Sequence, residues 1–568
     1  MIFWIVALVC AVTRLFAVAR SVWEWDEALF TMALRDYDVR MHHPHPPGFP
    51  VYVAMAKLVR LVVNDDFRAL QTVNVIAAML VFVAVFAFAR EIRLRFATCV
   101  SAGALFAFFP NVWFFGGGAF SDVPSIVLVL FAVTFLLKGT RSRNAYWLGT
   151  LLLALAIGIR PQNFLVGLVP GLLATRRRRW WEVLVALLIG VAIVGAAFGG
   201  AVYATGSLSE YQRMVREHGQ YIAQVDSFRS EDRPPLWRIL DRFFLKQYQS
   251  PVLSFIASIF VAVSVVGAFR ERNRPLFWNA MTFALFAIFA WLMLDRYSIS
   301  RFSIGYQPMF AVFLADGIAR VAKRREWMLS AAMVAAFFVY TFPALTPVRN
   351  EVAPSLLAAR AAADLVQREG RQLFVGQTMV VFLDLVDPDV PYTQVLDDRA
   401  MPIGAANDAW LLAEVTATPE TGRMFRRERG NLWNIARHHY FEIKLAPLEA
   451  RPRFASGWYA PEVAEKRPQR CMAGSSVTEL PPLNGEGLLR MHVEIPFELV
   501  ADHPAILVAL NGKEVARVRL DGRSLVRDFP VSPTPSGPNV LELSIDRTLR
   551  GDDREVGLCV RNLSWGPA

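Results

Sequence analysis

Long apolar runs, separated by short polar turns, fill the first 346 residues of the chain. A membrane-spanning helix needs about 17–25 mostly apolar residues. The pattern therefore predicts a polytopic α-helical membrane protein with about eleven spans, of which the short pair around Arg160 is also consistent with one broken helix. The predicted spans lie near residues 1–20, 69–89, 96–110, 120–137, 145–159, 162–175, 180–203, 251–269, 276–294, 303–319 and 327–346.

The composition agrees with a membrane protein. Of the 568 residues, 55% are hydrophobic and only 19% are charged, and the mean hydropathy is +0.35. Soluble chains carry about 25% charged residues. The composition therefore excludes a disordered, collagen-like or coiled-coil chain.

The chain has a net charge of +11, and all of its basic excess lies in the apolar part of the chain. Residues 1–346 hold 34 Lys and Arg against 20 Asp and Glu, whereas residues 347–568 hold 26 against 29. With a cytoplasmic N-terminus, every inner turn is basic, as the positive-inside rule requires, and the short outer turns offer only Arg160, Arg296 and Arg301. The charge is therefore a topology signal, and no nucleic-acid partner is needed to explain it.

This topology places three segments outside the cytoplasm: a first loop at 21–68, a loop at 204–250 and the tail from residue 347. We expect an integral protein of a bacterial-type cytoplasmic (inner) membrane, with extracytoplasmic C-terminal domains. Ala17-Val18-Ala19 resembles a signal-peptidase site, but no basic segment precedes the apolar stretch, so we expect the first span to be retained.

The tail divides into two predicted domains. Residues 347–453 alternate a helical pattern at 354–368 with short apolar strands at 373–376 and 410–415, which predicts a small α/β domain. Residues 454–568 contain strand-like stretches separated by turn signals, which predicts an antiparallel β-sandwich. Its predicted strands lie at 489–495, 505–510, 514–520, 540–545 and 556–563.

The chain has four cysteines. Cys10 and Cys99 fall in or beside predicted spans, where small apolar packing is the expected role. Cys471 and Cys559 lie near the two ends of the predicted sandwich, in an oxidising compartment if the topology holds. The first and last strands of such sandwiches are often neighbours, so a disulfide and two free thiols both stay open.

An acidic pair, Asp26-Glu27, opens the first outer loop between apolar neighbours such as Trp25 and Leu29. Desolvation raises the basicity of a carboxylate, which suits general-base work, whereas solvated boundary charges are the alternative. Adjacent helical positions diverge by about 100°. We therefore expect one carboxylate to face the reactants and the other to orient the loop or bind a cation.

The same loop carries a histidine cluster held by prolines, His42-His43-Pro44-His45-Pro46-Pro47-Gly48. Imidazole and guanidinium groups suit a phosphate leaving group. A rigid, purely structural loop is the alternative. The histidine spacing matches no strong zinc pattern.

An Asp-Glu pair after the first span, followed by a His-Pro-Pro stretch, resembles the GT-C superfamily of membrane glycosyltransferases. The resemblance is closest to the family 39 branch, which includes protein O-mannosyltransferases and the aminoarabinose transferases of lipid A. Ser121-Asp122-Val123-Pro124 resembles the second acidic position of that superfamily. The stretch from Asp295-Arg296-Tyr297 through Arg301-Phe302 to Pro308 resembles its Arg-aromatic-x-x-Pro segment, and the resemblance covers about residues 1–346.

The resemblance implies transfer of one hexose or pentose, with inversion, from a polyprenyl-phosphate donor to a lipid, glycan or protein acceptor outside the cytoplasm. Asp26 is then expected to be the general base, with Glu27 and Asp122 as further catalytic candidates. No cofactor is implied beyond a candidate divalent cation. The candidates for binding the donor phosphate and substrate are His43, His45, Arg160, Arg296, Tyr297 and Arg301.

Several alternatives stay open. A glycan block transferase or ligase is one alternative function, and a lipid or sugar transporter with an exported sugar-binding tail is another. Transporters place ionisable groups in mid-membrane and show internal repeats, whereas the carboxylates here lie at predicted helix ends. Asp122 is also a candidate helix cap, and Trp458 and Tyr459 are candidates for sugar stacking or for the domain core.

The loop 204–250 offers a mixed basic and aromatic surface. Such a loop suits a position on lipid headgroups above the site, but nothing in its pattern is diagnostic of a function. Its candidate residues are Arg213, His218, Tyr221, Arg233 and Tyr248.

Overall fold

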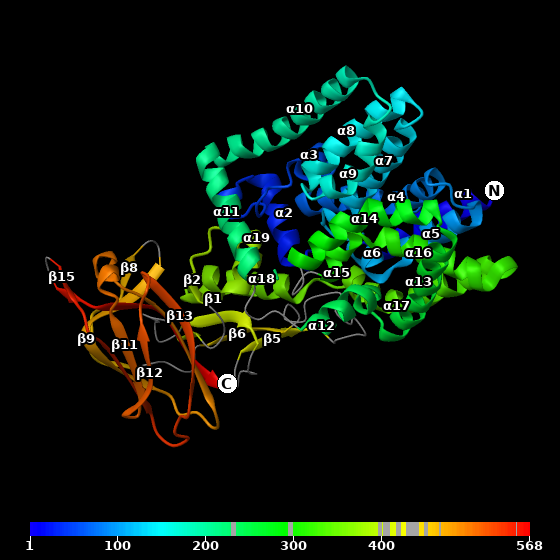
Figure 1. Cartoon of the computed structure of the whole chain (residues 1–568). Helices are drawn as coiled ribbons and strands as arrows, with labels where there is room; N and C mark the ends of the chain where they lie inside the picture. The colour runs from blue at the N-terminus through cyan, green and yellow to red at the C-terminus, as the bar shows by residue number, and fades with distance from the viewer. Residues whose placement is uncertain are drawn as a thin grey trace. The chain divides into compact units, whose positions relative to one another are not determined.

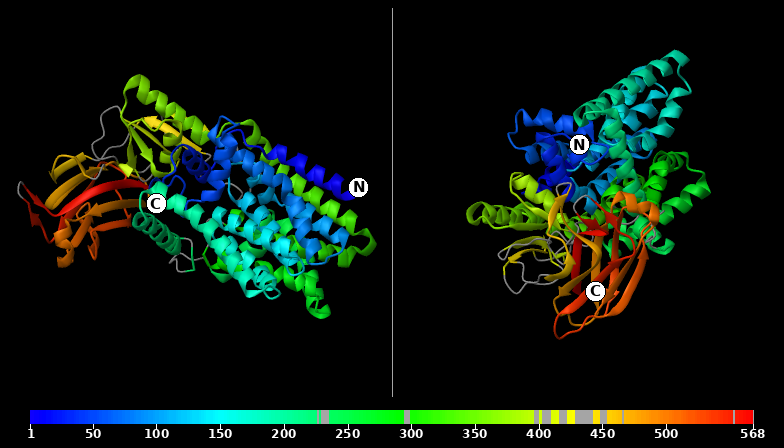
Figure 2. Two further views of the ribbon diagram at one scale, coloured as in Figure 1. Left: turned by 90° about the horizontal axis from the view of Figure 1, so that it is seen from above. Right: turned by 90° about the vertical axis from the view of Figure 1, so that its left-hand side faces the viewer.

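The computed structural model divides the chain into two compact units, of which the first contains residues 1–353 and the second begins at Pro354. Figures 1 and 2 show that the first unit is helical and that the second contains the β-strands. Each unit is described by itself. The structure describes residues 1–225, 227–228, 235–293, 299–395, 400–401, 409–415, 422–427, 442–447, 453–464, 467–551 and 554–567.

Each predicted span corresponds to a helix of the first unit (Figure 1). The first span ends as a short 3-10 turn, η1 (Arg14–Ala17), and the pair around Arg160 forms two separate helices. The helices are α1 (Ile2–Thr13), α4 (Asp66–Glu91), α5 (Phe96–Phe108), α7 (Asp122–Gly139), α8 (Arg143–Ile159), α9 (Asn163–Thr175), α10 (Trp180–Thr205), α13 (Pro251–Glu271), α14 (Arg274–Met293), α16 (Gln307–Ala322) and α17 (Glu326–Asn350).

Six helical stretches within the described residues are long and apolar enough to cross a membrane. They include α4, α7, α10, α13 and α14, and the stretch Gln307–Glu369, which holds α16 and α17. The helices α1, α5, α8 and α9 are apolar but shorter. The predicted polytopic helical architecture is therefore confirmed.

The helices differ in how much of their apolar surface the protein itself covers. In α7, 72% of the most apolar window is buried, because this helix packs against α4, α8 and α9. In α10, only 6% of the corresponding window is buried. An apolar helix with so little protein contact requires lipid around it, whereas α7 forms part of the protein core.

Short helices connect the spans at the end of the unit that carries residues 21–68. They are α2 (Trp25–Arg35), η2 (Val39–Met41), α3 (Pro50–Arg60), α6 (Pro110–Phe115), α11 (Leu208–Val225), α12 (Leu236–Leu240) and α15 (Ile299–Phe302). Two of them begin with proline. At the first helical position a backbone N–H has no acceptor within the helix, so proline, which lacks this N–H, loses no hydrogen bond there.

The second unit begins with an α/β arrangement. Its five-stranded sheet has the order β2-β1-β4-β6-β5, in which β1 pairs in parallel with β2 and β4. The predicted helix and both predicted strands of this region are present. The elements are α18 (Pro354–Glu369), β1 (Leu373–Gly376), α19 (Gln377–Val386), β2 (Thr393–Val395), β4 (Trp410–Glu414), β5 (Arg423–Arg426) and β6 (Glu442–Pro447).

The rest of the second unit is β-rich, as predicted. Most of its strands join into one sheet with the central order β12-β11-β14-β9-β17-β10-β13, which encloses a shared apolar core. The strands β15 (Leu549–Arg550) and β16 (Glu555–Val556) form a separate two-stranded sheet. The bounds are β3 (Ala400–Met401), β7 (Arg453–Trp458), β8 (Glu462–Ala464), β9 (Arg467–Leu480), β10 (Gly487–Glu494), β11 (Ala505–Leu510), β12 (Lys513–Arg519), β13 (Ser524–Val531), β14 (Asn539–Ile545) and β17 (Leu558–Pro567).

Cys471 and Cys559 form a disulfide in this sheet. They are direct register partners on the neighbouring strands β9 and β17. Of the two possibilities left open by the sequence, the structure therefore has the disulfide. Cys10 and Cys99 are free and buried, as expected for packing residues.

The aromatic pair at the start of the β-rich region is engaged within the second unit. The Trp458 indole N–H donates to the hydroxyl of Thr478 at 3.0 Å, and the ring packs against the apolar core. The Tyr459 hydroxyl donates to the carbonyl of Glu555 at 2.6 Å, and the Arg554 guanidinium lies 4.9 Å from its ring centroid. This placement favours a packing role for Trp458 over sugar stacking.

Candidate active site

Glu27 fastens the start of α2 to a distant part of the chain. Its carboxylate accepts hydrogen bonds from the backbone N–H groups of Trp23 at 2.8 Å and Glu24 at 3.0 Å, and the bond from Glu24, the N-cap residue, is one half of a capping box. The other carboxylate oxygen accepts from the N–H of Ala119 at 2.7 Å. A Cβ at Gly118 would lie 2.2 Å from that oxygen, so this approach requires glycine there.

Burial raises the pKa of the Glu27 carboxyl group to about 6, although the three backbone N–H groups act to lower it. The side chain is almost completely buried. Both of its oxygens are used to join two segments, which fits the loop-orienting role expected of one member of the acidic pair.

Asp26 faces the opposite way and stays accessible. Its Oδ2 forms an ion pair with Arg301 on α15, and its Oδ1 lies 3.9 Å from Nδ1 of His45. The side chain of Asp26 is 23% exposed. The two adjacent carboxylates therefore occupy different environments, as the angular divergence along a helix predicts.

A second ion pair continues from the first. Arg160, which follows the last residue of α8, donates from Nη2 to Oδ2 of Asp122 at 2.8 Å and from Nε to the hydroxyl of Ser121 at 3.0 Å. Nε of Arg301 lies 3.5 Å from the same Asp122 oxygen. Asp26, Arg301, Asp122 and Arg160 thus form a row of alternating charge, which we call the acid–arginine cluster.

Aromatic rings enclose both guanidinium groups of the cluster. The Phe302 ring centroid lies 5.3 Å from Cζ of Arg160 and 5.5 Å from Cζ of Arg301. Phe49 covers Arg160 at 5.5 Å, and Phe120 covers Arg301 at 5.3 Å. These cation–π contacts support the charges and exclude water, which strengthens the electrostatic interactions of the cluster.

Ser121 does not act as a conventional helix cap. It occupies the N-cap position of α7, but its side chain makes no capping hydrogen bond and instead accepts from Arg160. Asp122 is the first residue of the same helix, and its carboxylate serves both arginines. The acidic position identified in the sequence therefore takes part in a tertiary ion-pair network.

The histidine loop brings His45 to the cluster. Gly48 adopts φ of +100°, and its carbonyl accepts a hydrogen bond from the Tyr37 hydroxyl at 2.8 Å, which holds the bend in the loop. The His45 ring lies 4.8 Å from the Phe49 ring, between centroids. Burial lowers the pKa of His45 to about 4 against the attraction of Asp26, so the imidazole is neutral at neutral pH.

The structure does not bring every predicted site residue together. The backbone of His43 exchanges two hydrogen bonds with that of Asp38, and the charged groups that act on its imidazole are Asp36, Asp38 and His42. His43 therefore faces a different set of groups from His45. Arg296 and Tyr297 lie outside the described residues, and their predicted roles stay predictions.

Two further residues lie at the site: Tyr52, which was not a candidate from the sequence, and His218, which the sequence offered only as one of the basic and aromatic residues of the loop 204–250. Tyr52 on α3 is fully buried, and its hydroxyl has no hydrogen-bond partner within the described residues. The charged groups that act electrostatically on this hydroxyl are Glu27, Asp122 and Arg160. His218 on α11 lies beside His45, with the ring centroids 5.6 Å apart. The sequence signal for His218 was the mixed basic and aromatic composition of the loop 204–250.

A candidate metal centre at the cluster finds no support in the described part of the chain. There, the one group of three or more potential ligand atoms is Glu462, Cys471 and Cys559, and the two cysteines are already joined. The expected cation therefore has no ligand set assigned to it.

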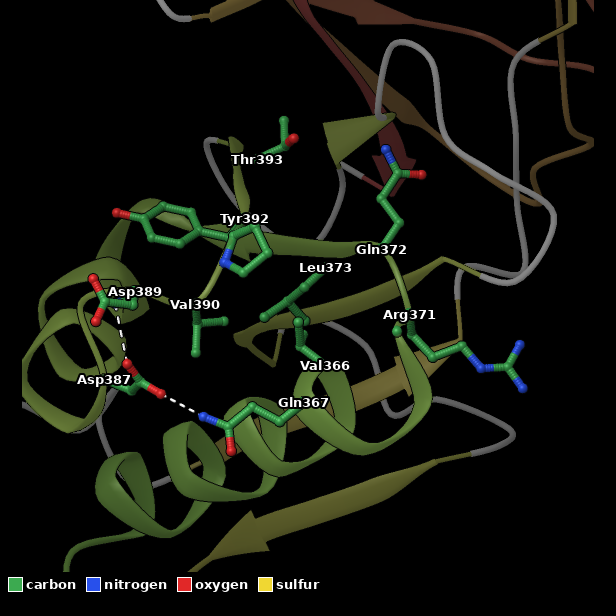
Figure 3. Close-up of a pocket in the computed structure, with 12 residues that line it drawn as sticks. Val366, Gln367, Arg371, Gln372, Leu373, Asp387, Asp389, Val390, Tyr392 and Thr393 are labelled. Atoms are coloured by element: carbon green, nitrogen blue, oxygen red, sulfur yellow. Dashed lines mark hydrogen bonds between the residues drawn. The ribbon is translucent and has the colours of Figure 1, made fainter.

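The second unit has a cavity of its own (Figure 3). It encloses about 550 Å³ beside the end of α18 and the starts of β1 and β2. The Asp387 carboxylate accepts a hydrogen bond from the Gln367 side chain at 2.5 Å, and Arg371 lies at the opposite end of the cavity. None of the predicted site residues lines this cavity.

Comparison with known proteins gives one family match. Residues 42–203 match the family model described as Dolichyl-phosphate-mannose-protein mannosyltransferase. No curated protein sequence matches the chain. The matched segment includes His45, Asp122 and Arg160, and it excludes Asp26 and Arg301.

Solved structures similar to this chain include those of three proteins. ArnT from Cupriavidus metallidurans is 13% identical, with 78% of this chain and 97% of ArnT covered and a TM-score of 0.48. The oligosaccharyltransferase AglB from Archaeoglobus fulgidus is 10% identical, with 68% and 64% covered and a TM-score of 0.47. The arabinosyltransferase EmbB from Mycobacterium smegmatis is 12% identical, with 99% and 64% covered and a TM-score of 0.38.

The family match falls on the helical unit, where the sequence motifs are found. It begins within the histidine loop and continues through α10. The resemblance of this unit to the GT-C glycosyltransferases, in the branch of the protein O-mannosyltransferases, is confirmed by that match.

Proposed function

We propose that the protein is a membrane glycosyltransferase that moves one sugar from a polyprenyl-phosphate donor to an acceptor outside the cytoplasm, with Asp26 as the general base. The observation that carries the proposal is the acid–arginine cluster, in which an accessible carboxylate lies against two aromatic-covered guanidinium groups. Such a pairing supplies both parts that glycosyl transfer from a phosphate needs, a base for the acceptor and cations for the leaving group.

In the proposed reaction, Asp26 takes the proton from an acceptor hydroxyl as its oxygen attacks the anomeric carbon. The bond from that carbon to the donor phosphate oxygen breaks, and the polyprenyl phosphate leaves with the electron pair. Attack opposite the leaving group gives inversion. Arg301 is the cation assigned to the phosphate, because a planar guanidinium can bind two phosphate oxygens at once.

Arg301 also couples the two halves of this reaction. In the free protein it is shared between Asp26 and Asp122. A donor phosphate competes for the same guanidinium, and its binding releases carboxylate lone pairs of Asp26 for the acceptor. The proposed base is therefore activated only when the donor is in place.

Arg160 and Asp122 are assigned a supporting role. Their side chains are only 7% and 4% exposed, so the pair is more deeply buried than Asp26 and Arg301. A buried carboxylate paired on two sides holds the guanidinium groups apart at a set distance. His43, Arg296 and Tyr297 stay candidates for contacts to the donor.

The location of the cluster favours an enzyme over a transporter. Asp122 begins α7, Arg160 follows α8, and Asp26 lies in the first turn of the short helix α2. Transport sites lie near the middle of the membrane and are built from broken spans. Transfer of a preassembled glycan would use the same groups, and the length of the transferred glycan separates that reaction from the one proposed.

The proposal is tested with the purified full-length protein and a polyprenyl-phosphate sugar. Asp26→Asn retains the size of the side chain and removes its basicity, so transfer should fall by a factor of about 100 or more while donor binding persists. Asp316→Asn, which alters an acid–arginine pair elsewhere in the bundle, is the matched control and should retain activity. Full transfer by Asp26→Asn would refute Asp26 as the base.

A further inference from the structure

A line of imidazole rings leads from Asp26 to the surface of the first unit. Nδ1 of His45 lies 3.9 Å from the Asp26 carboxylate, and its ring centroid lies 5.6 Å from that of His218. The His218 ring in turn lies 6.3 Å from that of His42, which is exposed. The side chains become more exposed along this line.

The line is assembled from two distant parts of the chain. His42 and His45 belong to the proline-rich loop, whereas His218 lies on α11, which contacts η2. The Tyr211 hydroxyl, also on α11, donates a hydrogen bond to the carbonyl of Pro47 at 2.9 Å. This bond fixes the helix against the loop, so the approach of His218 to His45 is a built feature of the fold.

We infer that His45, His218 and His42 form a proton relay that carries the proton from Asp26 to solvent after each transfer. The inference rests on the proposed function, because only a base that collects a proton in every cycle needs such a path. The O–H bond of the Asp26 carboxyl group breaks and an N–H bond forms on His45. His45 then releases a proton toward His218, and His42 delivers one to water, so that all groups return to their starting states.

The distances suit transfer through single bridging waters. A gap beyond 3.5 Å between polar groups is commonly closed by one water molecule, and proton transfer through one water is an accepted geometry. Nδ1 of His45 has no hydrogen-bond partner within the described residues, although it is buried. A buried ring nitrogen that faces the proposed base is therefore available to accept its proton.

The electrostatic setting keeps the relay ready to accept a proton. Burial lowers the pKa of His45, His218 and His42, so all three rings are neutral at neutral pH. Around His45 the charged groups are Asp26, Arg160 and Arg301, and Asp26 also acts on His218. Asp26 favours a proton on both rings, which directs the transient charge along this line.

His218→Ala removes the middle ring of the relay and leaves the reacting groups in place. With the purified full-length protein and a polyprenyl-phosphate sugar, His218→Ala should lower kcat about tenfold at pH 7 and leave the donor KM within about twofold. Added imidazole should restore kcat as its concentration rises, since a free base can replace the missing ring. His503→Ala, at an exposed site on the second unit, is the control that should show neither effect.

A second measurement does not depend on turnover. In protein labelled with ¹⁵N-histidine, Asp26→Asn should lower the pKa of His218, because the Asp26 charge is one of the groups that raises it. An unchanged kcat in His218→Ala, a loss that imidazole does not restore, or an unmoved His218 pKa would overturn the relay. If the wild-type protein transfers no sugar while the His218 pKa still differs between the wild type and Asp26→Asn, the proposed function is refuted and the coupling between Asp26 and His218 is supported.

Discussion

The first unit contains two acid–arginine networks with the same chemistry and different construction. In the acid–arginine cluster, Asp122 and Arg160 are 4% and 7% exposed. In the second network, Arg320 pairs with Asp316 at 2.5 Å and with Glu271 at 2.6 Å, and Glu271 is 57% exposed. The first network holds its Asp122–Arg160 pair inside the protein, whereas the second reaches solvent through Glu271.

Their origins in the sequence also differ. Asp316 and Arg320 are one turn apart on α16, a spacing at which opposite charges meet on any helix. Asp26 and Arg301 are separated by 275 positions and lie on different helices. A local pair needs no further explanation, but a buried network assembled across the fold must offset the desolvation of each charge.

This difference supports the proposal that the acid–arginine cluster is the active site. Buried charges that contribute little net stability are retained mainly where their chemistry is used, and perturbed ionisable groups gather at functional sites. The Arg320 network resembles ordinary helix-end pairing. The acid–arginine cluster, with its aromatic cover and its adjacent histidine, has the features of a site.

The largest difference is expected in stability. Arg160→Ala leaves the Asp122 carboxylate buried with one partner fewer, which should destabilise the protein by about 3–5 kcal/mol. Arg320→Ala removes a partly solvated pair and should destabilise it by about 1 kcal/mol or less. Thermal unfolding in detergent measures both, and equal losses would contradict the distinction between the two networks.

Donor binding should separate the networks next. Arg301→Ala removes the guanidinium assigned to the donor phosphate, so the donor KM should rise about 100-fold while the acceptor KM changes little. Arg320→Ala is the matched control, with the donor KM expected to stay within about twofold. An unchanged donor KM in Arg301→Ala would remove this residue from the phosphate site.

Acid sensitivity gives the smallest expected effect. The pKa of His45 is about 4 in the folded protein, below the ordinary value of 6.5, so folding favours the neutral ring. This contribution is complete above pH 6.5 and is lost as the pH falls from 6.5 to 4, by roughly 2 kcal/mol after allowance for solvent screening. His45→Gln should lose less stability than the wild type over that interval; equal acid sensitivity in thermal scans would contradict the buried neutral state.

The helical architecture could be predicted because membrane crossing is decided locally. About twenty apolar residues in succession satisfy their own backbone hydrogen bonds as a helix, whatever the rest of the chain does. The β-rich region was predicted less fully. The strand β9 was missed because Arg467–Leu480 contains small and polar residues without a clear alternation, and it is defined by its pairing with β14 and β17.

The disulfide illustrates the same limit. The positions of Cys471 and Cys559 made a bond plausible, but two cysteines 88 residues apart are joined only if the strands that carry them are neighbours. Pairing of β9 with β17 places them in direct register. Strand order is a tertiary property, so the sequence left both states open.

By itself the sequence determined the spans, the acidic pair after the first of them, the histidine loop and the basic turns. These features depend on residue type and short spacing. Only the tertiary structure decided that Asp26 faces Arg301 while Glu27 binds backbone N–H groups, and that His218 reaches His45. The physical reason is that electrostatics and hydrogen bonding act over a few ångströms, and distances between helices far apart in the chain are set by how their surfaces pack.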